Sequence, residues 1–256
     1  LNTLSDAYLV IEDGCFVDYG EMNDCPPISD NEEVVDANGG AVLPSWCDSH
    51  THIVYAGSRE QEFVDKIRGL SYAEIAKRGG GILNSADRLH ELSEDELYQQ
   101  AMKRVDEIIR KGTGCVEIKS GYGLNTEDEL KMLRVIRRIK ETTRLKVVAT
   151  FLGAHAVSRE YKGRQDAYVD LIINEMIPAV GDENLAEFID VFCDTGFFTP
   201  EETARILKAG AVYGMRPKIH ADELASSGGV EIGVEYKAVS VDHLESMTEE
   251  EIDILK

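Results

Sequence analysis

Two histidines one residue apart carry the clearest chemistry in this sequence. His50 and His52 stand in the stretch LPSWCDSHTH, after a short apolar run at 41–43. On an extended strand alternate side chains point to the same face, so both imidazoles would point the same way. Neutral imidazoles side by side are typical ligands of a divalent transition metal. The alternative, two chance histidines near a strand end, is less attractive because the chain has only 6 histidines.

A third ligand and a proton acceptor follow later in the chain. His220, in PKIHADE, comes after another short apolar strand, as a third ligand should. A catalytic metal keeps one position open for water and lowers the pKa of that water. Glu223 is a candidate to take the proton, although a carboxylate at a helix start is also explained by the helix dipole alone. His243 and Asp242, in SVDHLE, come from the next strand.

Composition limits the partners and the compartment. The chain has 256 residues, 43% hydrophobic and 29% charged, which is enough to bury a sizeable core. Its formal net charge of -21 argues against nucleic acid and against an anionic membrane surface as partners. The 5 cysteines include no CxxC pair and are typical of reduced thiols in a cytoplasmic protein. No apolar run approaches the roughly 18 residues that a membrane span needs.

The elements that must position these histidines fall into two parts. Residues 1–40 are predicted to form part of a small β-domain, with a hairpin turn at Asp13-Gly14. Residues 41–256 alternate between strands and helices and are predicted to be the catalytic domain. Strands are expected at 41–48, 115–119, 146–152, 188–193, 217–221 and 238–242. Capping boxes are expected to start helices at Ser71…Glu74, Ser93…Glu96, Thr126…Glu129, Thr199…Glu202 and Thr248…Glu251.

Strand–helix alternation fits both a doubly wound sheet and a (β/α)8 barrel. Polar residues sit at or just past the end of each strand, and a barrel gathers those ends at one mouth. A doubly wound sheet would normally show a glycine-rich phosphate turn after its first strand, and the only triple glycine, at 79–81, follows a helix. A barrel is therefore preferred. Because only about six strands are found, the α/β barrel is expected to be incomplete and the chain to be truncated at its C-terminus.

These residues resemble a known family. An HxH motif after an apolar strand, with histidines on two later strands, is similar to the amidohydrolase superfamily. The more specific resemblance is to the imidazolonepropionases, and it runs in order from residue 41 onward. It rests on DSHTHIVYAGSREQEF at 48–63, GGGI at 79–82, VEIKSGYGL at 116–124, TFLGAHAV at 150–157, FIDVFCDTGFF at 188–198, KIHADE at 218–223 and VDHL at 241–244.

The resemblance implies a role for each matching residue. His50, His52 and His220 would bind one divalent metal, Zn or Fe, while Glu223 and His243 would act on the nucleophilic water. Four residues would line the substrate pocket: Arg59, Tyr72, Tyr122 and His155. Of these, Arg59 would pair with a carboxylate of the substrate. In isolation each of these four could equally be an ordinary surface or core residue. The family's fourth metal ligand, an aspartate on the last barrel strand, is expected beyond the C-terminus.

The implied activity is hydrolysis of the cyclic amide of 4-imidazolone-5-propanoate to N-formimidoyl-L-glutamate, in histidine degradation. The substrate would be a small molecule, and the resemblance allows a homodimer. One alternative is another amidohydrolase, such as a purine or triazine deaminase. It would share the HxH motif, but it would not need Arg59 for a carboxylate tail. The other alternative is an inactive, metal-free fragment.

Overall fold

The chain is described by a computed structural model that covers residues 3–70, 74 and 81–256. It divides into two compact units, Leu1–Pro44 and Ser45–Lys256. The boundary expected near residue 40 lies in the same stretch without regular structure that precedes Ser45. Among the helices of the described ranges, none combines the length and the apolar character needed to cross a bilayer.

The first unit contains an antiparallel hairpin. Strand β1 (Ala7–Glu12) pairs with β2 (Cys15–Glu21), and a short 3-10 turn, η1 (Met22–Asp24), follows. The two residues between the strands, Asp13 and Gly14, both have positive φ, 51° and 78°. Two-residue hairpin turns with that geometry favour the Asp-Gly pair found here. The hairpin predicted at this turn is confirmed.

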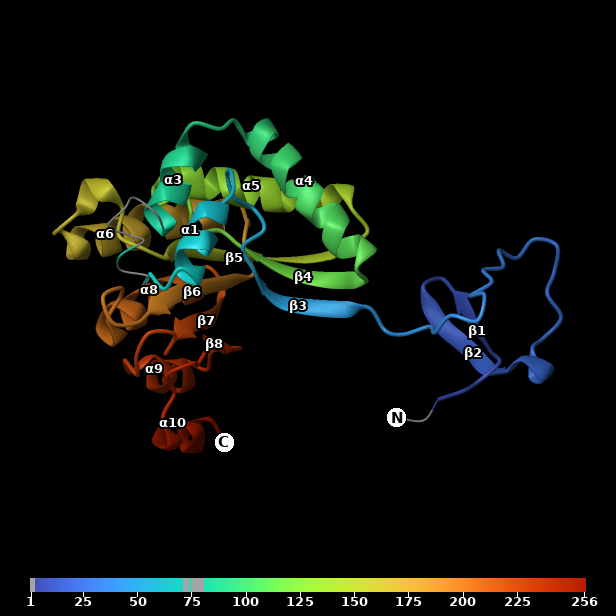
Figure 1. Cartoon of the computed structure of the whole chain (residues 1–256). Helices are drawn as coiled ribbons and strands as arrows, with labels where there is room; N and C mark the ends of the chain where they lie inside the picture. The colour runs from blue at the N-terminus through green and yellow to red at the C-terminus, as the bar shows by residue number, and fades with distance from the viewer. Residues whose placement is uncertain (1–2, 71–73, 75–80) are drawn as a thin grey trace. The chain divides into compact units, whose positions relative to one another are not determined.

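The second unit is built on a parallel sheet of six strands in sequence order, β3-β4-β5-β6-β7-β8 (Figure 1). A doubly wound sheet would reverse its order at a switch point, whereas a barrel winds in one direction. Among the described residues β3 and β8 each have one neighbouring strand, so the fold is an incomplete (β/α) barrel, as predicted. The strands are β3 (Trp46–Thr51), β4 (Thr113–Lys119), β5 (Lys146–Ala154), β6 (Phe188–Cys193), β7 (Arg216–Ala221) and β8 (Val241–His243).

The first strand begins later than predicted. It was expected over 41–48, but β3 starts at Trp46, whose backbone N–H donates to the carbonyl of Gly112 at 2.9 Å. The apolar run at 41–43 is instead exposed and lies outside the sheet. Pro44, which follows that run, has no N–H to give to a ladder. The ladder therefore runs into the HxH motif, with His50 inside β3 and His52 just after it.

The sheet curls so that its two ends approach one another. Lys218 of β7 donates from Nζ to the carbonyl of Ser49 in β3 at 2.9 Å. His50 of β3 lies with its Nδ1 2.8 Å from Oδ2 of Asp242 in β8. β3 and β8 are the first and last strands of the sheet, so only strong curvature allows these contacts. This curvature gives the sheet a concave inner face, as in a barrel.

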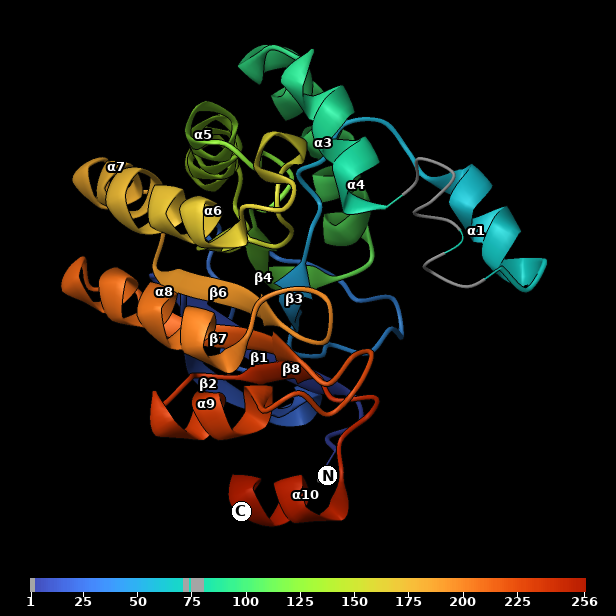
Figure 2. The same ribbon diagram turned by 90° about the vertical axis from the view of Figure 1, so that its left-hand side faces the viewer.

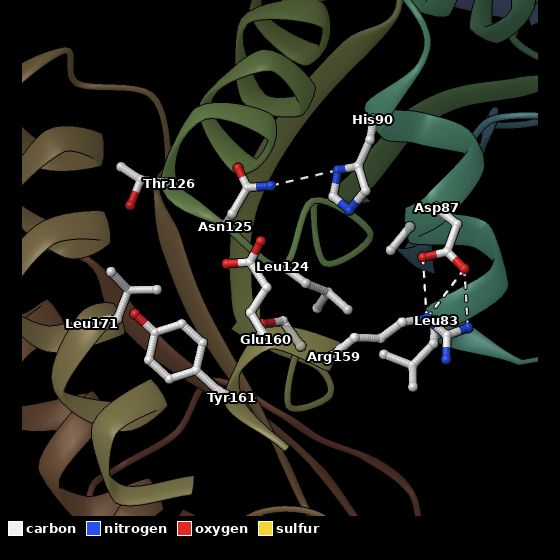
Figure 3. Close-up of a pocket in the computed structure, with 12 residues that line it drawn as sticks. Leu83, Asp87, His90, Leu124, Asn125, Thr126, Arg159, Glu160, Tyr161 and Leu171 are labelled. Atoms are coloured by element: carbon white, nitrogen blue, oxygen red, sulfur yellow. Dashed lines mark hydrogen bonds and ion pairs between the residues drawn. The ribbon is translucent and has the colours of Figure 1, made fainter. Parts of the chain in front are cut away.

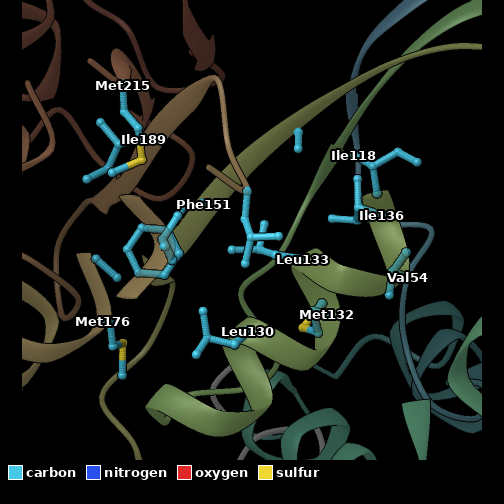
Figure 4. Packing of buried hydrophobic residues seen from close by; sticks show 14 of the residues in the cluster. Val54, Ile118, Leu130, Met132, Leu133, Ile136, Phe151, Met176, Ile189 and Met215 are labelled. Carbon is cyan, nitrogen blue, oxygen red and sulfur yellow. The ribbon is translucent and has the colours of Figure 1, made fainter. Parts of the chain in front are cut away.

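Helices cover the outer face of the sheet, as Figures 1 and 2 show for α4, α5, α8 and α9. On α5, the apolar side chains of Leu133 and Ile136 are fully buried with Ile118 of β4 and Phe151 of β5 (Figure 4). Burying each such side chain contributes roughly 1.5–3 kcal/mol. The helical segments are α1 (Glu60–Ile67), α3 (Ile82–His90), α4 (Glu94–Arg110), α5 (Thr126–Thr142), η2 (Arg159–Tyr161), α6 (Gln165–Leu171), η3 (Ile172–Met176), α7 (Ile177–Asp182), α8 (Pro200–Val212), α9 (Gly229–Glu235) and α10 (Glu249–Leu255).

Most of the predicted helix starts are found. The capping boxes at Ser93, Thr199 and Thr248 are present, with reciprocal side-chain and backbone hydrogen bonds. The box predicted at Thr126…Glu129 is wrong, because Asn125 is the N-cap and accepts from the N–H of Asp128 at 2.9 Å. The carboxylate of Glu129 instead accepts backbone N–H groups of the loop that precedes the helix. Ser71 of the remaining box lies outside the described residues.

Candidate metal centre

Three histidines meet on the inner face of the curled sheet. His50 and His52 come from β3 and the position after it, and His220 comes from β7. The ring centroids of His50 and His220 are 4.5 Å apart, and those of His50 and His52 are 5.3 Å apart. One ring nitrogen from each histidine lies within 4.8 Å of the others, which is close enough to share one ion.

The chemistry of these histidines fits a metal ion. Nδ1 of His52 and Nε2 of His220 are buried and have no hydrogen-bond partner among the described residues. Burial, then the neighbouring His155, places the pKa of His52 well below its usual range. Burial likewise lowers the pKa of His220, although Asp190 opposes that effect. The rings are therefore neutral near pH 7 and keep nitrogen lone pairs, which are what a transition metal binds.

Two carboxylates lie behind two of the candidate ligand histidines. Oδ2 of Asp242 lies 2.8 Å from Nδ1 of His50, and Oδ2 of Asp190 lies 2.9 Å from Nδ1 of His220. The contact at His50 is a hydrogen bond, which leaves Nε2 as the free lone pair and fixes the ring, whereas the contact at His220 has the distance of an ion pair without hydrogen-bond alignment. Burial by itself would raise the pKa of Asp190, but His220 and Lys119 outweigh burial and hold that pKa well below its usual range.

A buried ion network supports these carboxylates. Nζ of Lys119 lies 2.7 Å from both Asp190 Oδ2 and Glu117 Oε1, and the side chains of Lys119 and Asp190 are 0% exposed. Lys218 binds the other carboxylate oxygen of Glu117 and lies 3.4 Å from Asp242. Buried charges need such partners, because an unpaired one would be strongly destabilising.

Sequence reasoning found only part of this network. Asp242 was named without a role, whereas Glu117, Asp190 and Lys218 were missed. A signal was present: polar or charged residues two positions apart inside otherwise apolar strands, at 117/119 and 218/220, share one face. In a barrel that face is the interior, where charge is expected only at a site.

Glu223 and His243 lie at the rim of the same cluster. Oε2 of Glu223 is 3.6 Å from Nδ1 of His243, and the His243 ring lies 5.0 Å from that of His220. Both are positioned by unusual backbone, since φ is 54° at Asp222 and 81° at His243. Non-glycine residues with positive φ cost free energy and cluster at functional sites. Asp194 holds the backbone that follows Asp222 in place, because its carboxylate accepts the N–H of Leu224 at 2.9 Å.

Tyr122 and His155 close the other side of the cluster. The ring of His155 stacks on that of His52 at 5.1 Å, and Tyr122 lies 5.8 Å from His52 and 5.3 Å from His155. Burial, then the neighbouring His220, lowers the pKa of His155 to about 3. His155 is therefore a neutral ring at pH 7, and its Nδ1 lies 2.9 Å from the carbonyl of Gly121.

The structure does not bring every predicted pocket residue to the strand ends. Arg59 lies immediately before α1, where its Nε and Nη2 donate to Oε2 of Glu62 at 2.8 and 2.5 Å. Helix α1 stands off from the sheet (Figure 2). Tyr72 lies outside the described residues.

A separate cavity of about 380 Å³ lies between α3, the start of α5 and η2 (Figure 3). It is lined in part by Asp87, His90 and Arg159 and contains none of the predicted ligands. Nδ1 of His90 lies 2.5 Å from Oδ2 of Asp128, so this histidine has a structural partner. Arg159 is paired with Asp87 in the same wall.

Comparison with known proteins gives strong matches along the whole chain. The chain is 55% identical over 256 residues to an imidazolonepropionase of Christiangramia forsetii and 53% identical over the same span to one of Flavobacterium johnsoniae. It is 44% identical to an imidazolonepropionase of Thermoanaerobacter pseudethanolicus. Each match takes in 100% of this chain and 61–62% of the relative, so the chain spans about three fifths of the length of these relatives. A scan against models of protein families gave no match.

Solved structures share the fold at low sequence identity. A 5-methylcytosine deaminase from Klebsiella pneumoniae, liganded with phosphonocytosine, has a TM-score of 0.61 and 13% identity, over 91% of this chain and 53% of that one. A guanine deaminase from C. acetobutylicum, with guanine bound, has a TM-score of 0.56 and 14% identity, over 98% of this chain and 60% of that one.

The singly wound parallel sheet, with histidines gathered at the strand ends, defines the chain as an incomplete (β/α) barrel with a candidate metal centre. Within that class the sequence matches are specific, and they extend from the first residue to the last. Over its full 256 residues the chain is similar to imidazolonepropionases, of which it spans about three fifths.

Proposed function

We propose that the protein is a metal-dependent hydrolase that opens the cyclic amide of 4-imidazolone-5-propanoate and releases N-formimidoyl-L-glutamate, a step of histidine degradation. The observation that carries this proposal is the cluster of His50, His52 and His220, which has unpaired ring nitrogens. The cluster lies in a chain that matches imidazolonepropionases from its first residue to its last. The reducing cytoplasm is the proposed location, because none of the 5 cysteines forms a disulfide. A homodimer is the proposed assembly.

His50, His52 and His220 would hold one divalent ion. Imidazole nitrogen suits Zn and Fe, so we propose one of these two. When bound, the ion would supply Lewis-acid polarisation and lower the pKa of a water molecule. Asp242 and Asp190 would keep the first and third rings in the tautomer that presents Nε2.

Glu223 would take the proton from the attacking water and pass it to the ring nitrogen as the C–N bond breaks. Its carboxylate oxygen Oε2 lies 3.6 Å from His243 Nδ1, so the two groups stand next to each other at the rim of the cluster. His243 would stabilise the negative charge that develops on the carbonyl oxygen. These roles need an ionised Glu223 and a histidine that can donate.

The remaining proposed residues would hold the substrate. Tyr122 and His155 form one wall beside His52 and would contact the imidazolone ring. The guanidinium of Arg59 would pair with the propionate carboxylate, for which its planar fork is suited. In the structure the Glu62 carboxylate occupies that fork, so binding would exchange one carboxylate for another. Tyr72 stays in the proposal by family resemblance.

Substitution of Arg59 tests the assignment of the carboxylate partner. In the full-length protein, Arg59→Ala should raise KM for 4-imidazolone-5-propanoate by about 10-fold to 100-fold, because charge-assisted hydrogen bonds are lost. Metal content per chain should not change. Arg68→Ala is the matched control, since that arginine lies at the other end of the same helix and its side chain is 67% exposed. An unchanged KM in Arg59→Ala would show that another residue binds the carboxylate.

A substrate panel separates this activity from the deaminases that share the fold. The proposal predicts turnover of the imidazolone and none of guanine or 5-methylcytosine, which lack a carboxylate tail. Turnover of a nucleobase without turnover of the imidazolone would establish the alternative instead.

A further inference from the structure

The loop between β4 and α5 has a conformation that its own sequence does not favour. In residues 120–124, φ is 108° at Gly121 and 54° at Leu124. A leucine with positive φ is strained, and such strain persists only where surrounding contacts fix it. A Cβ at Gly123 would lie 2.3 Å from the backbone nitrogen of Glu129, so this loop is pressed directly against α5.

One buried carboxylate binds this loop along its length. Oε1 of Glu129 accepts the N–H groups of Gly123 and Leu124 at 2.8 and 2.9 Å, and Oε2 accepts that of Gly121 at 3.0 Å. The Glu129 side chain comes from the first turn of α5 and is fully buried. It therefore satisfies three backbone donors that have no strand or helix partner, in a place where water cannot replace it.

The same loop sets two walls of the candidate site. Tyr122 lies between the two glycines that Glu129 binds. The carbonyl of Gly121 lies 2.9 Å from Nδ1 of His155 and would accept a hydrogen bond from its N–H, which leaves Nε2 of that ring as an acceptor. A Cβ at Gly121 would come within 2.8 Å of the same Nδ1, so the loop and His155 fit tightly together.

We propose that Glu129 is a positioning residue for the substrate pocket: its carboxylate fixes residues 120–124 so that Tyr122 and His155 face the bound ring. This inference rests on the proposed function. Among the described residues Glu129 makes no hydrogen bond to a histidine of the candidate metal centre, so it acts on substrate binding rather than on metal binding.

Glu129→Gln in the full-length protein tests this role. Glutamine keeps the size of the side chain, but its NH₂ group would face a backbone donor and one acceptor would be lost. We expect the amides of Gly121, Gly123 and Leu124 to exchange at least about 10-fold faster, because they lose protection. KM should rise by about 10-fold, metal content should stay at the wild-type level, and Glu129→Asp should recover part of the effect.

Glu127→Gln is the matched control, because it removes the same charge from an exposed position of the same helical turn. It should change neither exchange nor KM. Unchanged exchange in Glu129→Gln, or faster exchange with an unchanged KM, would overturn the inference. If Glu129→Gln does not fold, Glu129→Asp carries the test with the same criteria. A wild-type protein that does not turn over the imidazolone would overturn the proposed function and the substrate role with it, whereas active wild type with unaffected variants would overturn only the role of Glu129.

Discussion

At the scale of single residues, the candidate site depends on how its histidine rings are oriented. Asp242 and Asp190 each face the Nδ1 atom of a candidate ligand histidine, and Lys119 lies 2.7 Å from Asp190 and 3.6 Å from Asp242. One buried cation therefore stabilises both carboxylates in their ionised form. Loss of either carboxylate would leave the positive charge of Lys119 only partly compensated in the protein interior.

Asp190→Asn should weaken metal binding, and in this variant Lys119 keeps Glu117 as its buried partner. The substitution keeps the shape but removes the charged acceptor at His220, and changes of this kind typically cost about 10-fold to 100-fold in metal affinity. Competition with a chelator of known affinity would measure the change. Asp170→Asn, which breaks only an exposed ion pair with Arg205, is the control. Equal affinity of Asp190→Asn and wild type would show that Asp190 does not orient the ligand.

At the scale of elements, the sequence predicted what local pattern can specify. Strands β4 to β8 were found from their apolar runs, whereas the apolar run at 41–43 lies ahead of β3, and three capping boxes were confirmed. The box at Thr126 was wrong because two residues could cap the same helix, and Asn125 does so. Its Glu129 was free to bind the preceding loop, a tertiary contact that no spacing rule reveals.

The start of α5 also makes a pH-dependent contribution to stability. Burial would raise the pKa of Asp128, but hydrogen bonds from Lys131, Asn125 and His90 outweigh burial and lower it. A carboxyl with a lowered folded-state pKa stabilises the fold above its unfolded pKa of about 4, and that contribution is lost as pH falls through the folded pKa.

Asp128→Asn should therefore lower the free energy of unfolding by about 1 kcal/mol at pH 7. The difference from wild type should shrink as pH falls below about 4. It should vanish once the Asp128 carboxyl is protonated in both the folded and the unfolded state. Urea denaturation at a series of pH values would measure it, with Glu127→Gln as the control in the same turn. A difference that stays constant down to pH 2 would contradict this assignment.

At the scale of the whole molecule, the site exists only because the sheet curls. His50 and Asp242 are 192 positions apart in the chain and lie on the first and last strands. Periodicity predicts each strand, but it does not state how far the sheet closes, so contacts between its ends could not be read from the sequence. The HxH motif, the third histidine and the rim residues could be named from resemblance, whereas the buried charges that hold them could not.

The central claim is that this histidine cluster binds one metal ion and that hydrolysis depends on it. The most direct measurement follows metal content and 4-imidazolone-5-propanoate turnover in parallel. It starts from full-length protein freed of metal with a chelator, to which Zn or Fe is added in steps. We predict that turnover rises in proportion to occupancy and saturates at about one ion per chain. His220→Ala should abolish both binding and turnover. Turnover that persists in the metal-free protein, or one bound ion with no turnover, would contradict the claim.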